Sequence, residues 1–215
     1  MLSRPLGSKR GQRRRRRRDR GPDRQPRRLR TQTGLERDSV RVFVAVFPPP
    51  EVQQALIEAA RLTPTNAFRL TAPERVHLTL KFLGDVPPDS LPRITATLEP
   101  IRRDHEPFDV LTSSFGVFPS PRRARVLWAG LGEGKEQMRS LAQTVETLLE
   151  PEGFQPEKKS FMPHITLGRA RRPTPFDPTG ANLPELRFTV SAIDLVQSKH
   201  SPKGVAYSTL TRYEL

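Results

Sequence analysis

The sequence predicts an α+β fold rather than a doubly wound parallel sheet. Strand-like and helix-like segments occur in roughly equal measure, and several strand-like segments follow one another directly along the chain. In addition, one strand-like segment in each half of the chain carries the pattern His-x-Thr. This repetition suggests two similar lobes that face each other across a groove.

The first half of the chain alternates strand and helix patterns. Residues 40–47 (VRVFVAVF) are rich in β-branched and aromatic residues, which predicts a strand that ends at three consecutive prolines. Residues 51–62 follow these prolines with apolar residues at helical spacing, which predicts a helix. Residues 75–83 (RVHLTLKFL) predict a second strand, and residues 89–104 predict a second helix with either Asp89 or Ser90 as its N-cap.

The second half repeats this rhythm. Residues 133–149 predict the clearest helix, because five apolar side chains recur on one face and Gly153 stands just beyond its end. A proline-rich connection is expected over residues 173–184. The remaining strands are expected at residues 108–115, 125–129, 162–167, 187–196 and 204–213.

Basic charge is concentrated at the start of the chain. Residues 1–38 hold 15 of the 37 Lys and Arg residues but only 4 of the 23 Asp and Glu residues, so most of the net charge of +14 lies there. Because this segment is nearly without apolar residues, we expect a disordered Arg-rich tail over residues 1–38 and a folded domain over residues 39–215. The tail is either an arm that attracts RNA phosphates or a solvated extension, including one added by a misassigned start codon.

Several classes of protein are excluded or disfavoured. The chain has no cysteine, which excludes disulfides, thiol catalysis and Cys-based zinc sites. It has no apolar run of the ~18 residues that a membrane span needs, and neither a P-loop nor a serine nucleophile-elbow pattern. We expect a soluble, cytoplasmic, monomeric protein with no membrane partner.

Two of the four histidines lie in the same sequence frame. They occur in HLTL, which begins at His77, and in HITL, which begins at His164. Because side chains on a strand alternate between its two faces, each histidine shares a face with the threonine two residues later, Thr79 or Thr166. The aliphatic residues between them then point into the core, together with Phe82 of the first strand. Each strand would hold an imidazole and a hydroxyl rigidly toward a groove.

Two imidazoles on opposite sides of one substrate suit a reaction that needs a general base and a general acid together. The ordinary histidine pKa of about 6.5 allows one ring to be neutral while the other is protonated. Displacement at a phosphodiester is such a reaction, and the threonine hydroxyls can donate hydrogen bonds to the non-bridging phosphate oxygens. No metal or other cofactor is required, and neither motif has a third ligand at zinc spacing.

In their longer contexts the paired motifs resemble those of the 2H phosphoesterase superfamily, and specifically the RNA 2′,3′-cyclic phosphodiesterases, historically called 2′-5′ RNA ligases. The similarity covers roughly residues 40–214 and includes RVHLTLKFLGDV, FPSPRRARVLWAGL, FMPHITLGRA and SPKGVAYSTLTRYEL. The resemblance implies two pseudo-symmetric lobes, each an antiparallel sheet with outer helices, around a central groove. It also implies hydrolysis of a terminal RNA 2′,3′-cyclic phosphate to a 2′-phosphomonoester without a cofactor.

The resemblance assigns roles to the four motif residues. His77 would be the proton donor to the departing 3′ oxygen, and His164 would be the proton acceptor that activates water. Thr79 and Thr166 would hold the phosphate. The residues alone permit either assignment of the two histidines, because a pseudo-symmetric site offers the same groups from both sides. The substrate would be RNA that ends in a 2′,3′-cyclic phosphate, with tRNA fragments as one possible source.

Basic and aromatic residues near the motifs are secondary candidates. Arg169 follows the second motif within contact range of a phosphate, and Arg122 and Arg123 belong to a loop suited to gripping an RNA backbone. A solvated surface position explains each of these arginines equally well. His105 and His200 lack the motif and are expected at the surface. Further candidates with a structural alternative are Lys81 (expected to be exposed), Arg125, Lys158, Lys159, Phe118 and Trp128.

Two alternative functions stay open. The same chemistry run backwards, with an RNA hydroxyl in place of water, would ligate tRNA halves through a 2′-5′ linkage. A non-enzymatic RNA-binding module led by the Arg-rich tail would instead bind RNA in a salt-sensitive way without needing either histidine.

Overall fold

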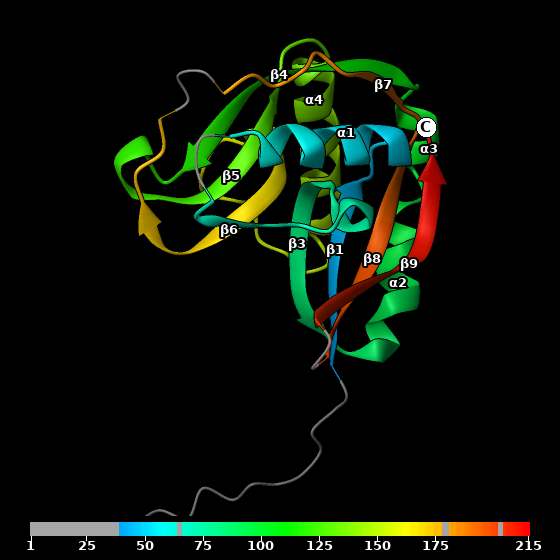
Figure 1. Ribbon diagram of the computed structural model, residues 1–215. Helices are drawn as coiled ribbons and strands as arrows, with labels where there is room; N and C mark the ends of the chain where they lie inside the picture. The colour runs from blue at the N-terminus through cyan, green and yellow to red at the C-terminus, as the bar shows by residue number, and fades with distance from the viewer. Residues whose placement is uncertain (1–38, 64–65, 178–180, 202–203) are drawn as a thin grey trace, which may run out of the picture. The chain divides into compact units, whose positions relative to one another are not determined.

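The computed structural model describes residues 39–63, 66–177, 181–201 and 204–215 (Figure 1). The disordered tail predicted over residues 1–38 lies outside these ranges. The described residues form two antiparallel sheets and a small number of helices, which confirms the α+β prediction.

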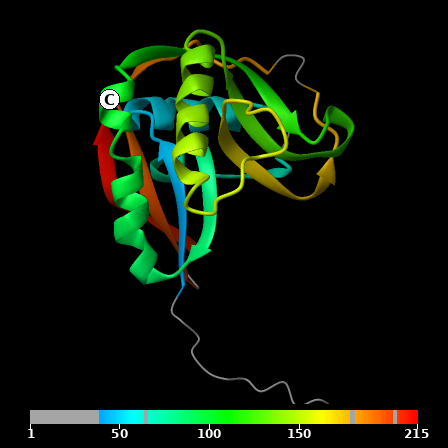
Figure 2. The ribbon, with the colours of Figure 1, turned by 180° about the vertical axis from the view of Figure 1, so that it is seen from behind.

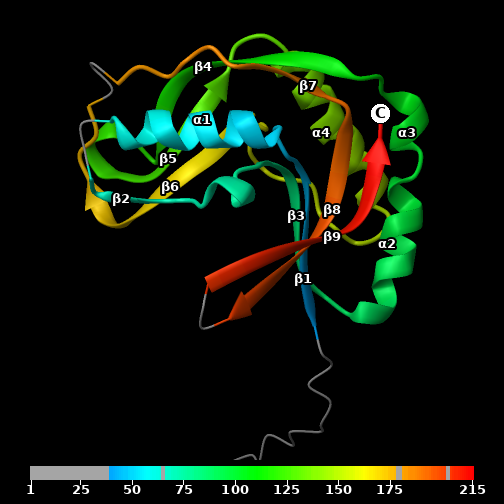
Figure 3. The same cartoon turned by 45° about the vertical axis from the view of Figure 1, so that its right-hand side comes forward.

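The first sheet has four antiparallel strands in the order β3-β1-β8-β9. Their bounds are β1 Val40–Val46, β3 Leu78–Val86, β8 Ala192–Ser201 and β9 Gly204–Glu214. In Figure 3 the start of β9 crosses in front of β1 and β3. Arg75, just ahead of β3, donates a hydrogen bond from Nη1 to the carbonyl oxygen of Val205 on β9, 2.9 Å away. The strand at the far edge of this sheet therefore reaches the first His-x-Thr motif.

The second sheet has five antiparallel strands in the order β2-β6-β5-β4-β7. Their bounds are β2 Phe68–Leu70, β4 Phe108–Phe118, β5 Ala124–Leu131, β6 His164–Thr174 and β7 Arg187–Val190. The two sheets do not correspond to the two halves of the chain. The first half contributes β2 to the second sheet, and the last two strands return to complete the first sheet.

The helices flank these sheets. Figure 1 shows α1 on the viewer's side, and Figure 2, from behind, shows α2 and α4 on the other side. Gly134 precedes α4 with a φ of 77°, and a Cβ on it would lie 2.4 Å from the carbonyl oxygen of Asp109, so only glycine fits this start. The helical segments are α1 Pro50–Arg61, α2 Leu91–Leu98, α3 Ile101–Asp104, α4 Lys135–Leu149 and the 3₁₀ turns η1 Pro73–Arg75, η2 Pro88–Ser90 and η3 Pro121–Arg123.

Three features differ from the predicted elements. The single helix expected over residues 89–104 is divided into η2, α2 and α3, with a break at Glu99 and Pro100, because proline cannot continue the hydrogen-bond pattern of a helix. The single strand expected over residues 187–196 is two strands that belong to different sheets, since the chain crosses between them at Ser191. The short strand β2 was not predicted, because three residues carry no usable periodicity.

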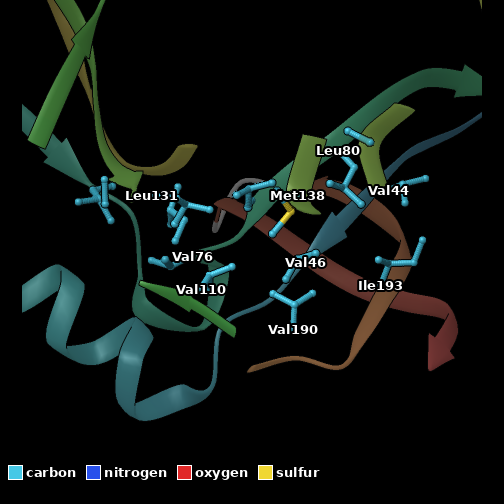
Figure 4. Packing of buried hydrophobic residues seen from close by; sticks show 14 of the residues in the cluster. Val44, Val46, Val76, Leu80, Val110, Leu131, Met138, Val190 and Ile193 are labelled. Atoms are coloured by element: carbon cyan, nitrogen blue, oxygen red, sulfur yellow. The ribbon is translucent and has the colours of Figure 1, made fainter. Parts of the chain in front are cut away.

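One apolar core joins both sheets and α4 (Figure 4). Its members include Val44, Val46, Leu80, Val110, Met138 and Val190, all almost fully buried. A second, smaller cluster on the opposite face of β1 contains Phe43, Ala45 and Val196, with Tyr207 packed against it. Strand β1 is therefore buried on both faces, and its second face supports the residues around the first motif.

Candidate active site

Residues from both sheets line a cavity of about 310 Å³, here called the histidine cavity. His77 lies directly before β3, and His164 is the first residue of β6. Both histidines line this cavity, together with Thr79 and Thr166. The structure thus brings the four residues of the two motifs to one place, as the alternation of side chains along each strand predicts.

The two histidine rings are held in the same way. Nδ1 of His77 lies 2.7 Å from the carbonyl oxygen of Arg75, and Nδ1 of His164 lies 2.8 Å from the carbonyl oxygen of Met162. In each case the acceptor is the backbone two residues earlier. Because a carbonyl oxygen only accepts, Nδ1 must carry the hydrogen, and Nε2 is left to exchange a proton with a substrate.

Aromatic side chains surround each imidazole. The ring of His77 lies 5.0 Å from Phe43, 5.4 Å from Phe47 and 5.3 Å from Tyr207, measured between ring centroids. The ring of His164 lies 5.1 Å from Phe118 and 6.1 Å from Trp128. These contacts restrict both rings to one orientation and remove much of their surface from water.

This environment lowers the pKa of both histidines. Burial is the main cause for His77 and His164, because removing an imidazolium from water disfavours its charged form. The hydrogen bond to the backbone carbonyl opposes the shift in each case, and the positive charge of Arg169 adds to it. The His164 charge further lowers the pKa of His77, so the two rings are close enough to interact electrostatically.

A β-bulge after each motif changes which side chains reach the cavity. Leu80 is an extra residue opposite β1, and Leu167 is an extra residue opposite β5. Each bulge reverses the alternation of the side chains that follow it. As a result Phe82 and Arg169, each five residues after its histidine, both line the histidine cavity.

The prediction for Phe82 was therefore wrong. Its side chain was expected in the core, but it is 59% exposed and lies in the cavity, with its ring 5.9 Å from that of Phe43. The position of Arg169 in the sequence indicates such a bulge. Strict alternation would have buried its guanidinium in the core beside Leu167, which an unpaired arginine does not tolerate.

The prediction that Lys81 is exposed was also wrong, for the same reason. The bulge turns its side chain inward, where it is 3% exposed. Its Nζ lies 2.8 Å from Oε1 of Glu146 on α4 and donates a hydrogen bond to the carbonyl oxygen of Gln155, 3.0 Å away. Oε2 of Glu146 accepts a hydrogen bond from the backbone N–H of Glu157. These bonds connect the strand of the first motif to the segment that leads into the second.

Two other aromatic candidates lie beside His164, whereas two of the candidate arginines lie away from the cavity. Phe118 and Trp128 pack against His164 on the motif side of the second sheet, rather than in the main core. Arg122 and Arg123 are exposed in η3 and do not line the histidine cavity. His200 is exposed as expected, whereas His105 is half-buried and hydrogen-bonded to Thr144. Neither of these histidines lies in the cavity.

Sequence reasoning missed Tyr207 and Arg75. Both line the histidine cavity, and Tyr207 reaches it only because β9 crosses the face of its own sheet. No local pattern indicates such a long-range contact. Within the described residues, no three His, Cys, Asp or Glu side chains come together as a metal site, and no helix is long and apolar enough to span a membrane.

Comparison with known proteins gives a consistent result. The model of the 2′-5′ RNA ligase superfamily matches residues 48–202. A curated RNA 2′,3′-cyclic phosphodiesterase of Thermus thermophilus is 36% identical over 182 residues, which cover 82% of this chain and 90% of the relative.

Solved structures share the fold. The crystal structure of TT0787 of Thermus thermophilus has a TM-score of 0.71 and 33% identity, covering 81% of this chain and 97% of that one. The crystal structure of Escherichia coli LigT complexed with 3′-AMP has a TM-score of 0.69 and 25% identity, covering 83% of this chain and 99% of that one. The arrangement of the two sheets is therefore that of known phosphoesterase structures.

Proposed function

Because this chain belongs to the 2′-5′ RNA ligase superfamily, we propose that it hydrolyses the 2′,3′-cyclic phosphate at the end of RNA to a 2′-phosphomonoester. One observation carries the proposal. Two imidazoles line a single cavity, and the Nδ1 of each is bound to the backbone, so that each has Nε2 available for proton transfer. Such a pair suits a displacement at phosphorus, in which one proton is removed while another is delivered.

In the proposed reaction, Nε2 of His164 takes a proton from water as the water oxygen forms a bond to phosphorus. The bond from phosphorus to the 3′ oxygen breaks, and Nε2 of His77 gives its proton to that oxygen. The 2′ oxygen keeps the phosphate. The two rings have matching backbone hydrogen bonds, so by this geometry either ring could act as the acid. The direction of proton transfer is taken from the family resemblance.

The proposal gives Thr79, Thr166 and Arg169 the task of holding the phosphate. Both hydroxyls and the guanidinium belong to the lining of the histidine cavity. They are donors suited to the non-bridging oxygens, whose negative charge grows as water attacks. The charge of the guanidinium also lowers the pKa of both histidines, so Arg169 lies close to both rings.

Several finer points stay predictions from the sequence. They are RNA binding by Arg122 and Arg123, tRNA fragments as substrates, a monomeric state, a cytoplasmic location, independence from metals, and a division into a tail over residues 1–38 and a two-lobed domain over residues 39–215.

The test of this function is incubation with an oligoribonucleotide that ends in a 2′,3′-cyclic phosphate, in the presence of EDTA. We expect conversion of the cyclic end to a monoester. A second RNA with a free 5′ hydroxyl, added to the same reaction, detects ligation through a 2′-5′ linkage. Water is in large excess over any RNA hydroxyl, so we expect hydrolysis to dominate. Joined product in excess of hydrolysed product would favour the ligase alternative.

The lowered pKa values of the histidines predict an acidic optimum. The rate needs one neutral and one protonated ring, so kcat/KM of the free enzyme is highest between the two pKa values of the pair. Burial moves both below the ordinary 6.5, so that optimum is expected below pH 6.5. The bound phosphate anion raises both pKa values, so kcat should peak at higher pH than kcat/KM. A kcat/KM maximum above about pH 7 would contradict the role of burial.

Phe82 is expected to bind the base of the terminal nucleotide. Its ring is exposed within the histidine cavity and supported from behind by Phe43. Phe82→Ala should raise KM by about tenfold or more, since stacking on an aromatic ring contributes about 1–3 kcal/mol per base. Phe82→Tyr keeps the ring and serves as the matched control. An unchanged KM in Phe82→Ala, measured with two different terminal bases, would exclude this role.

A further inference from the structure

A second and larger cavity adjoins the histidine cavity. It has a volume of about 570 Å³ and lies between α4 and the segment of residues 156–162 that leads into β6. We call it the lysine cavity, after Lys158 and Lys159. The two cavities share four lining residues, Leu80, Glu157, Phe161 and His164. An RNA strand held in one cavity can therefore continue into the other. Its volume is within the range of about 300–1,000 Å³ that is typical of ligand-binding cavities.

The lysine cavity offers two lysine side chains that form no ion pair within the described part of the chain. Lys158 and Lys159 are both exposed, and neither has an ion-pair partner among the residues that the structure describes. The acidic group of Glu146 is already paired with Lys81. Arg139, the third cation of the lining, is paired with Glu136. The carboxylate of Glu157 lines both cavities, so two cations and one anion of this lining have no ion-pair partner among the described residues.

Apolar side chains complete the wall of this cavity. Phe118 and Phe161 line it, and the side chain of Met162 is 46% exposed there. The backbone carbonyl of Met162 meanwhile accepts the hydrogen bond from His164. Apolar surface for a base, beside unpaired cations for a phosphate, is the combination by which proteins hold single-stranded RNA. A mononucleotide in the histidine cavity would contact neither the two lysines nor Met162, which line the lysine cavity alone.

We propose that the lysine cavity binds the nucleotide that precedes the terminal one in the RNA strand, with Lys158 and Lys159 contacting its phosphate. The cavity then selects polymeric RNA over cyclic mononucleotides. This inference rests on the proposed hydrolysis of RNA 2′,3′-cyclic phosphates. It makes the pair of lysines a determinant of substrate length, acting outside the chemical step.

The test compares two substrates: a tetraribonucleotide with a 2′,3′-cyclic phosphate end, and the corresponding cyclic mononucleotide. The measured quantity is the ratio of kcat/KM on the tetranucleotide to kcat/KM on the mononucleotide. We expect wild-type protein to favour the tetranucleotide. The Lys158→Ala/Lys159→Ala variant should lower the ratio by about tenfold, as expected for two exposed charge contacts. Its rate on the tetranucleotide should also depend less on salt.

Arg61→Ala/Arg103→Ala is the matched control, because it removes the same charge from exposed positions on α1 and α3 that line neither cavity. The control should keep the wild-type ratio. An unchanged ratio in the lysine variant, or an equal fall in both variants, would overturn the inference. A wild-type protein that hydrolyses neither substrate would instead overturn the proposed function, so the two failures are distinguishable.

Discussion

Replacing either motif histidine with alanine is expected to lower kcat by about 10²–10⁴, the usual contribution of a general acid or base. Both His77 and His164 line the histidine cavity, with Nδ1 of each bound to the backbone and aromatic rings around it. Alanine removes the group that moves the proton while leaving these neighbours in place. The measurement is single-turnover hydrolysis of an oligoribonucleotide with a cyclic phosphate end.

A second substrate distinguishes the acid from the base. An aryl phosphodiester releases a phenolate, which leaves without being protonated. The variant that lacks the acid should therefore lose much less activity on this substrate, and we expect this variant to be His77→Ala. His200→Ala is the control, because His200 is exposed and lies outside the cavity. Wild-type rates in either motif variant would contradict the proposed mechanism.

Lys81→Met is expected to lower the free energy of unfolding by about 3–5 kcal/mol, the usual effect of removing one partner of a buried ion pair. The side chains of Lys81 and Glu146 are 2% and 14% exposed, and 2.8 Å separates their charged atoms. The substitution leaves the carboxylate of Glu146 shielded from water without a counter-charge. It also removes the hydrogen bond to the carbonyl oxygen of Gln155. Urea denaturation of the variant and the wild type measures the difference.

Two further variants identify the cause of that loss. Lys81→Met/Glu146→Leu removes the stranded charge and should recover part of the stability. Arg41→Met breaks the exposed pair of Arg41 with Asp85, in which both side chains are more than half exposed, and should cost less than about 1 kcal/mol. If Lys81→Met were no more destabilising than Arg41→Met, the pair would not hold the two segments together.

Local sequence patterns predicted most of the helices and strands, because each of these patterns depends on residues that are close together in the chain. The β-branched run of β1 and the apolar face of α4 both appear in the structure with bounds within a few residues of those expected. The crossing of the chain at Ser191, between β7 and β8, leaves no such mark. The sequence pattern of an apolar strand does not depend on which sheet the strand joins. The order of the strands is determined instead by contacts between distant segments.

The candidate site was likewise predicted only in part. Alternation along a strand correctly places His77 beside Thr79 and His164 beside Thr166 on the cavity side, with the aliphatic residues between them in the core. It fails beyond Leu80 and Leu167, because at each of these positions a bulge adds one residue to the strand. Phe82 consequently lies in the cavity rather than in the core.

The measurement that most directly tests the central claim is the position of the phosphate on the product. Wild-type protein in EDTA should convert an RNA 2′,3′-cyclic phosphate entirely to the 2′-phosphomonoester, as read by phosphorus NMR, because the proposed acid protonates the 3′ oxygen. A 3′-phosphomonoester would contradict the assignment of the leaving oxygen. A cyclic phosphate that persists in EDTA but is hydrolysed when a metal is restored would contradict catalysis by the two histidines alone.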